Sequence, residues 1–122
     1  MADHAVVADV GAELVSGSTR LKAGTAQKLI LNAISTVTMI RLGRTYDGLM
    51  VSVVPDNAKL RERARRNVVL ASGAPEAAVD EALAAAEGDA RVALVTLLAG
   101  IDAAAARERL EQACGSVRQA LS

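Results

Sequence analysis

The residues best suited to chemistry lie together near the N-terminus, in a short hydroxyl-rich turn. The sequence Gly-Ser-Thr-Arg-Leu-Lys at residues 17–22 leads directly into a long segment with helical spacing of its apolar residues. Backbone N–H groups at a helix start lack intrahelical partners and carry the positive end of the helix dipole, so they favour a phosphate or a carboxylate. Hydroxyls and cationic side chains add further donors. We therefore predict an anion-binding turn made of Ser18, Thr19, Arg20 and Lys22.

The same turn has a second interpretation, as an ordinary helix start with two solvent-exposed cations, because helices often begin with Ser or Thr. The remaining sequence offers little other chemistry. His4 is the only histidine and Cys114 the only cysteine, so no metal site is predicted. We expect His4 on the surface and Cys114 as a semi-buried apolar filler. No pair of carboxyl groups is placed for acid–base work, and Glu13 receives no catalytic role. We thus predict no catalytic residue, metal ligand or cofactor.

The elements expected around this turn begin with a short buried strand at Ala5–Ala8, followed by a loop over residues 11–17. A strand with so little sequence before it is typical of the last strand of a larger sheet. A helix is predicted from about Arg20 to Leu42. Its apolar residues recur at helical spacing over a broad face, which predicts a well-buried helix. Gly43 is the expected C-cap.

A turn, a strand and a second long helix are predicted next. Asp47-Gly48 is typical of a tight turn, and the β-branched run at residues 49–54 predicts a short strand. Asp56 is predicted to cap a helix over residues 57–71. A capping role suits Asn57 equally well.

From residue 73 onward the sequence changes to short Ala-rich helices and repeats itself at an interval of 27 residues. Each unit is predicted to contain a helix, a glycine-containing turn and a second helix. This pattern resembles a small three-helix bundle of the ubiquitin-associated type. The matching pairs are Leu70 with Leu97, Gly73 with Gly100, Glu81 with Glu108, Leu83 with Leu110, and Gly88 with Gly115.

The composition predicts a soluble protein of one modest domain or two very small ones. Its 122 residues contain one Tyr and no Trp or Phe, so the core must be aliphatic. The 14 basic and 14 acidic residues cancel, which argues against a nucleic-acid binder. No apolar run is long enough for a membrane span. A lone cysteine and the lack of a visible signal peptide predict a reducing cytoplasm. Basic residues predominate over 20–66 and acidic residues afterwards, which favours an anionic ligand or an acidic partner near the first half.

Three segments carry a resemblance to a known family: residues 17–31, Arg-Leu-Gly-Arg-Thr-Tyr-Asp-Gly-Leu-Met-Val at 41–51, and Asn-Ala-Lys-Leu-Arg-Glu-Arg-Ala-Arg-Arg at 57–66. They resemble the C-terminal part of the N-acetylmuramic acid 6-phosphate etherases, whose distant relatives include glucokinase regulatory protein. The resemblance implies a mainly α chain. Residues 1–72 would be the remnant of an α/β sugar isomerase-type domain that binds sugar phosphates, with one or two short strands and the long helix. Residues 73–122 would be the small ubiquitin-associated-like module.

The activity that the resemblance implies is cleavage of the D-lactyl ether of N-acetylmuramic acid 6-phosphate to N-acetylglucosamine 6-phosphate and D-lactate, during cytoplasmic cell-wall recycling. No cofactor is implied, and a homodimer is expected. The family's two catalytic glutamates belong to an upstream segment, so the isolated 122-residue chain is predicted to be inactive. Two alternatives remain open: a sugar-phosphate-binding regulator without turnover, and a helical dimerisation or interaction module.

This sequence departs from the family pattern at three positions. Ser52 stands where the family has Asp, Asp56 where it has Thr, and Asn67 where it has an aliphatic residue. The contacts around these positions are therefore expected to differ from those of the family.

Overall fold

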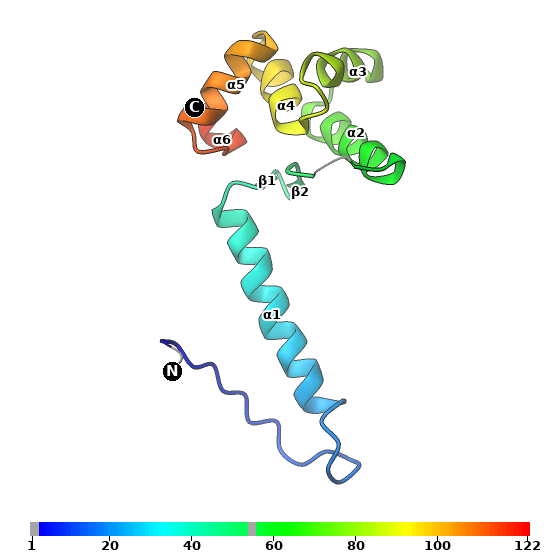
Figure 1. Cartoon of the computed structure of the whole chain (residues 1–122), viewed down its shortest axis with the longest axis vertical. Coiled ribbons are helices and arrows are strands. Elements are labelled where there is room, and N and C mark those ends of the chain that lie inside the picture. The colour runs from blue at the N-terminus through cyan, green and yellow to red at the C-terminus, as the bar shows by residue number, and fades with distance from the viewer. Residues whose placement is uncertain (1–2, 54–55) are drawn as a thin grey trace. The chain divides into compact units, whose positions relative to one another are not determined.

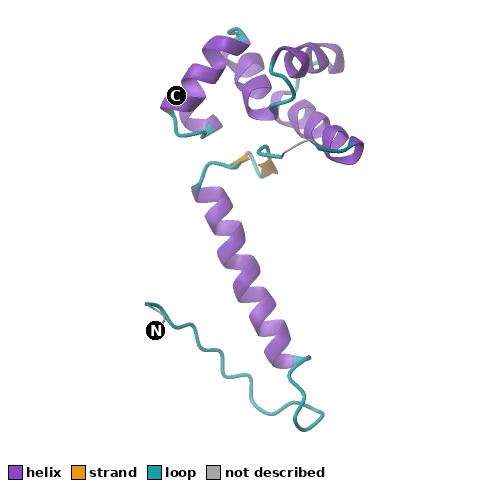
Figure 2. Ribbon diagram, in the orientation of Figure 1, coloured by secondary structure: helices purple, strands orange, loops and turns teal. Residues whose placement is uncertain are grey.

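The computed structural model describes residues 3–53 and 56–122. These residues form a mainly α-helical protein with one small antiparallel hairpin, which confirms the predicted fold class (Figures 1 and 2). Two compact units, Met1–Thr38 and Met39–Ser122, are described separately below. Among the described helices, none combines the length and apolar character that crossing a membrane requires. The elements are α1 (Lys22–Arg41), β1 (Thr45–Tyr46), β2 (Leu49–Met50), α2 (Ala58–Ser72), α3 (Glu76–Ala85), α4 (Ala90–Ala99), α5 (Ala103–Gln112) and α6 (Val117–Ala120).

The helix predicted from Arg20 to Leu42 is α1, and its end is as expected. Gly43 has a φ of 67° and donates its N–H to the carbonyl of Ile40, while Arg44 donates to Met39. These two bonds form a Schellman motif. In this motif a residue in the left-handed conformation turns the chain so that two backbone N–H groups bind the last helical carbonyls. Glycine adopts this φ at little cost because it has no Cβ.

The predicted burial of α1 is wrong, because α1 contains no buried residue. The helix forms where the apolar period of 3.6 residues predicts it. However, no described residue covers its apolar face. More than half of each of Leu29, Leu31 and Ile34 is accessible to solvent. The sequence pattern therefore predicted the apolar face of α1 correctly, but not its exposure.

The strand predicted at Ala5–Ala8 is also absent. Residues 5–13 form no helix or strand, and the side chains of Val6 and Val7 are 67% and 88% exposed. A strand is stabilised by hydrogen bonds to a neighbouring strand, and no described residue supplies one here. The apolar character of this segment alone is not sufficient to form a strand.

A tight hairpin follows α1 and confirms the predicted turn. Thr45 pairs with Met50, and Tyr46 pairs with Leu49. The two residues between the strands, Asp47-Gly48, have φ values of 47° and 75°, as a type I′ turn requires. The second strand is shorter than predicted, because β2 ends at Met50. Val54 and Pro55, where the predicted strand was to end, lie outside the described residues.

The second long helix, α2, is capped by Asn57 and not by Asp56. The Asn57 side chain accepts a hydrogen bond of 3.0 Å from the backbone N–H of Leu60, as an N-cap does. The Asp56 carboxylate instead accepts from the Asn57 side-chain amide. The predicted Asp56 cap is therefore wrong by one residue, and the alternative at Asn57 is confirmed.

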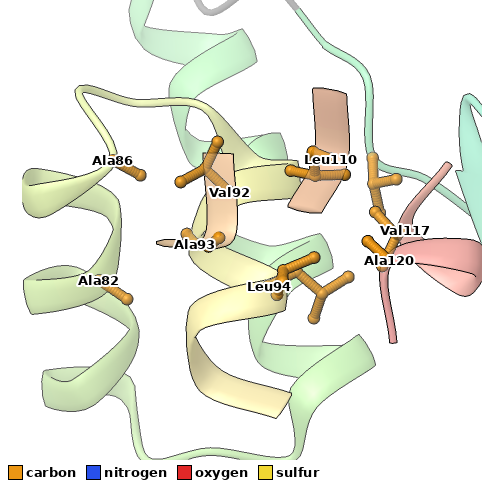
Figure 3. Packing of buried hydrophobic residues seen from close by; sticks show 11 residues of the cluster. Ala82, Ala86, Val92, Ala93, Leu94, Leu110, Val117 and Ala120 are labelled. Atoms are coloured by element: carbon orange, nitrogen blue, oxygen red, sulfur yellow. The ribbon is translucent and has the colours of Figure 1, made fainter. Parts of the chain in front are cut away.

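The core of the second unit is built around α4, which packs against α2, α3 and α5. Five residues of α4, at positions 90 and 92–95, are at most 2% exposed, so the first half of α4 is buried on most of its sides. In Figure 3, Ala82 of α3 and Ala86, which caps α3, point toward Val92 and Ala93 of α4. Val117 and Ala120 of α6 approach α4 from the other side, near Leu110 of α5, in the same view. The core is thus aliphatic, as the composition predicts.

The 27-residue repeat seen in the sequence is also a repeat of the backbone. α3 and α5 begin and end 27 residues apart, and α4 and α6 begin 27 residues apart. Gly73 and Gly100 cap α2 and α4 with φ values of 65° and 64°. Glu87 and Cys114 both have positive φ values, of 54° and 50°, at the end of α3 and α5. Each unit therefore forms the same helix, turn and helix.

The sequence places a domain boundary between residues 72 and 73, which is the junction of α2 and α3. In the structure, Ala64 and Val68 of α2 share a buried cluster with Val79 of α3 and Ala90 of α4. Val51, just after the hairpin, is 1% exposed in the main core cluster. By packing, the helical module therefore includes the hairpin and α2 (Figure 1).

Candidate functional site

Three of the predicted anion-binding residues, Ser18, Thr19 and Arg20, lie in one turn before α1, and the fourth, Lys22, is the first residue of α1. The N–H of Ser18 donates to the carbonyl of Val15 at 3.0 Å, which closes the turn. The N–H of Gly24 donates to the carbonyl of Thr19 at 2.8 Å, which ties the turn to the first helical residues. The backbone N–H of Arg20 donates to the Ser18 hydroxyl at 3.4 Å. The turn therefore has a defined backbone path held by local hydrogen bonds.

The start of α1 is capped by a residue that the sequence interpretation left without a role. The carboxylate of Glu13 accepts hydrogen bonds from the N–H of Lys22, at 3.0 and 3.2 Å to its two oxygens. The same carboxylate accepts from the N–H of Ala23 at 3.2 Å. A negative charge at this position also interacts favourably with the helix dipole. The anion bound at the helix start is thus the chain's own carboxylate.

A second contact joins the same two segments. The ammonium Nζ of Lys22 donates to the carbonyl oxygen of Ala12 at 2.7 Å. Glu13 and Lys22 therefore bridge the two ends of the 12–23 loop in opposite directions, carboxylate to backbone amide and ammonium to backbone carbonyl. We call this pair of contacts the Glu13–Lys22 clasp.

The clasp divides the four predicted residues into two groups. Lys22 is engaged through both its N–H and its ammonium, so its first role is to hold the loop. In the part of the chain that the structure describes, the Thr19 hydroxyl and the Arg20 guanidinium carry no hydrogen bond, and both residues are exposed. These groups, together with the Ser18 hydroxyl, are hydrogen-bond donors available to an anion.

Other chemistry is not indicated by the described residues. Within residues 3–53 and 56–122, no cluster of three or more His, Cys, Asp or Glu side chains is arranged to hold a metal ion. His4 is exposed, as predicted. Cys114 is exposed as well, so its predicted role as a semi-buried filler is wrong. The 27-residue repeat explains this, since Cys114 occupies the outward turn position that Glu87 occupies in the preceding unit.

The basic stretch on α2 is partly neutralised within the second unit. Arg65 binds Asp80 of α3 with its Nε at 2.6 Å and its Nη2 at 3.0 Å, and Nη2 also lies 2.8 Å from Glu76. The Arg65 guanidinium lowers the pKa of the Asp80 carboxyl, and the two carboxylates raise the pKa of Arg65. Arg65 therefore fastens α2 to α3. It also lines a hollow of about 450 Å³ together with Leu83 and Gly88, a hollow whose lining includes none of the predicted turn residues.

A second carboxylate is held at the start of α4. Burial alone would raise the pKa of Asp89, but hydrogen bonds from the Arg91 side chain and backbone outweigh it, and the pKa lies below its ordinary value. Asp89 caps α4 by accepting from the N–H of Arg91 at 2.9 Å. Its Oδ2 also lies 2.9 Å from the Arg91 guanidinium. These charged groups stabilise helix ends and junctions; none is arranged as an acid–base pair.

Comparison with known proteins decides the family. A protein of Rubrobacter xylanophilus named N-acetylmuramic acid 6-phosphate etherase is 57% identical over 119 residues, and one of Streptomyces avermitilis with the same name is 54% identical over 121 residues. A third protein with this name, from Deinococcus radiodurans, is 51% identical over 119 residues. These matches cover 98%, 99% and 98% of this chain. By sequence, the chain belongs to the N-acetylmuramic acid 6-phosphate etherase family.

The family membership applies to a segment of such proteins. The chain spans 39% of the length of each of these three curated relatives, and it corresponds to their C-terminal part. No protein-family model matches the chain. The resemblance carried by residues 17–31, 41–51 and 57–66 is thereby confirmed, while the activity of a whole etherase is a matter for proposal.

Proposed function

We propose that this chain is the C-terminal part of an enzyme that cleaves the D-lactyl ether of N-acetylmuramic acid 6-phosphate, giving N-acetylglucosamine 6-phosphate and D-lactate in the cytoplasm. The observation that carries the proposal is sequence identity of about half along nearly the whole chain to proteins with this name. These matches cover 98–99% of the chain, so they are not limited to one common motif. The physiological context is recycling of cell-wall amino sugars.

Within that enzyme, the turn of Ser18, Thr19 and Arg20 contributes donors to the sugar phosphate, with Lys22 beside it. The support is the exposure of Thr19 and Arg20, whose hydroxyl and guanidinium carry no hydrogen bond among the described residues, and the Ser18 hydroxyl, which accepts from the Arg20 N–H and keeps its own proton to donate. Replacing Arg20 by Ala in the complete enzyme should remove a charge-assisted hydrogen bond. A loss of about tenfold in affinity for the sugar phosphate is expected, because such a bond contributes roughly 1.5 kcal/mol at an exposed site. Unchanged affinity would leave the turn as an ordinary helix start.

The 122-residue chain alone should have no etherase turnover. The reaction requires one group that removes a proton from the sugar and another that protonates the departing oxygen. The two charged clusters of the helical module, Arg65 with Asp80 and Arg91 with Asp89, serve helix packing and capping. The test is an enzymatic assay for D-lactate released from N-acetylmuramic acid 6-phosphate, by the complete protein and by this chain. Release by the chain itself would contradict the proposal, and no release by the complete protein would favour a regulator that binds sugar phosphate without turnover.

A second proposed property is self-association into a dimer. The apolar residues of α1 are exposed along its length, and exposed apolar surface of this extent is typical of an interface. Light scattering at micromolar concentration measures the mass directly. A monomer that unfolds cooperatively would contradict self-association and would remove the support for a dimerisation module.

A further inference from the structure

The Glu13–Lys22 clasp has a consequence for ligand binding. Glu13 lies nine residues before Lys22, outside any helix or strand. Its carboxylate nevertheless accepts hydrogen bonds from two successive backbone amides at the start of α1. These are the amides that a helix start would otherwise offer to an anion. An anionic ligand at this turn therefore meets a helix start that is already occupied.

We propose that Glu13 is a positioning residue for the sugar-phosphate turn. Its carboxylate closes the amide positions of α1, fixes the path of residues 13–22, and leaves the hydroxyls of Ser18 and Thr19 and the guanidinium of Arg20 as the donors for the ligand's phosphate. Glu13 itself does not contact the phosphate, since two like charges at one helix start repel each other. The identity of the ligand rests on the proposed function, whereas the clasp rests on the geometry of this chain.

Three observations support this assignment. Both oxygens of Glu13 lie within 3.2 Å of the Lys22 amide, so the carboxylate is held at two points and not by a single bond. The Lys22 ammonium, at 2.7 Å from the Ala12 carbonyl, pulls the adjacent backbone toward the helix start. The Gly24 amide, the next in the helix, is bound to the Thr19 carbonyl. The three amides of residues 22–24 thus have internal partners, and the free donors are displaced to the side chains of the turn.

The first experiment measures the clasp in the 122-residue chain by amide hydrogen exchange, resolved by NMR. Glu13→Ala should accelerate exchange at Lys22 and Ala23 by about three- to tenfold, the effect of losing a capping carboxylate at an exposed helix start. Glu13→Gln keeps one acceptor oxygen and should give a smaller acceleration. Asp9→Ala is the matched control, because Asp9 is an exposed carboxylate of the same segment and, among the described residues, accepts a hydrogen bond from the Gly11 N–H alone. Equal exchange in wild type and Glu13→Ala would overturn the proposal.

The second experiment separates positioning from simple stabilisation in the complete protein. The probes are N-acetylglucosamine 6-phosphate and inorganic phosphate, titrated into wild type, Glu13→Ala and Asp9→Ala. Glu13→Ala should weaken binding of the sugar phosphate by about three- to tenfold while inorganic phosphate binds as tightly or more tightly, because two amides become free for a small anion.

Two other binding patterns of Glu13→Ala would contradict the positioning role. If both ligands weaken in parallel with a loss of thermal stability, Glu13 only stabilises the fold. If both bind more tightly, Glu13 is merely a competing anion. A wild-type protein that fails to bind the sugar phosphate would contradict the proposed function, whereas the exchange experiment would still decide whether the clasp exists.

Discussion

The contact between the end of α1 and the start of α6 gives the sharpest test of how this fold is held together. A Cβ atom added at Gly43 would lie 2.8 Å from both the Cα and the Cβ of Ser116. Ser116 cannot easily move aside, because it is the N-cap of α6 and its N–H is bound to the carbonyl of Ala113 at 3.0 Å. Gly43→Ala is therefore expected to strain two helix ends at once.

The expected cost follows from two separate effects. A left-handed φ such as the 67° of Gly43 costs an alanine about 1–2 kcal/mol. Forcing extra atoms into a closely packed contact adds about 1–3 kcal/mol. Gly43→Ala should therefore lower the free energy of unfolding by about 2–5 kcal/mol, a large part of the total stability of a small domain.

A matched control separates these effects. Gly73 has nearly the same φ, 65°, and also caps a helix, but a Cβ atom there would have no atom within 4 Å. Gly73→Ala should therefore show the φ cost alone. The assay is urea unfolding followed by far-UV circular dichroism and by the fluorescence of Tyr46, the only aromatic residue, which packs against the main core cluster. Equal destabilisation by the two substitutions would refute the packing argument at Gly43.

Three further substitutions test individual contacts. Thr96→Val should raise the free energy of unfolding by about 1 kcal/mol, since the buried Thr96 hydroxyl has no hydrogen-bond partner among the described residues; destabilisation in urea would contradict this. Arg65→Ala should lower the urea midpoint at neutral pH. Because Arg65 lowers the pKa of folded Asp80, this difference should be complete above the unfolded pKa of about 4 and should shrink as the pH falls below it. Ser52→Asp should convert the 2.8 Å hydrogen bond from Arg44 into an ion pair, adding at most about 1 kcal/mol, and high salt should remove the gain.

The features that the sequence predicted correctly depend on neighbouring residues. The Gly43 cap and the Asp47-Gly48 turn each require a positive φ, which glycine and Asp-Gly pairs adopt readily, so the residue types themselves carry the signal. The 27-residue repeat is likewise visible because its glycines and leucines recur in register. Tertiary partners are not needed for any of these conformations.

The features that failed depend on partners distant in sequence or outside the described residues. Ala5–Ala8 has the composition of a strand, but a strand forms only against a neighbour, and α1 has the apolar period of a buried helix without a covering surface. Asn67, one of the departures from the family, shows the same limit on a smaller scale. Its side-chain amide donates to the carbonyl of Met50 at 2.8 Å and so joins α2 to the hairpin, a contact that residue type alone does not indicate.

Glu13 marks the limit of sequence reasoning at the candidate site. Capping boxes are recognised because the cap and its partner are three residues apart. Glu13 instead caps α1 across nine residues, through a loop whose path is set by the Ser18 and Lys22 contacts. The sequence predicted an anion at the helix start and assigned it to a ligand. The structure places the carboxylate of Glu13 there, which is why the donors proposed for a ligand are the side chains of Ser18, Thr19 and Arg20 in the turn before α1.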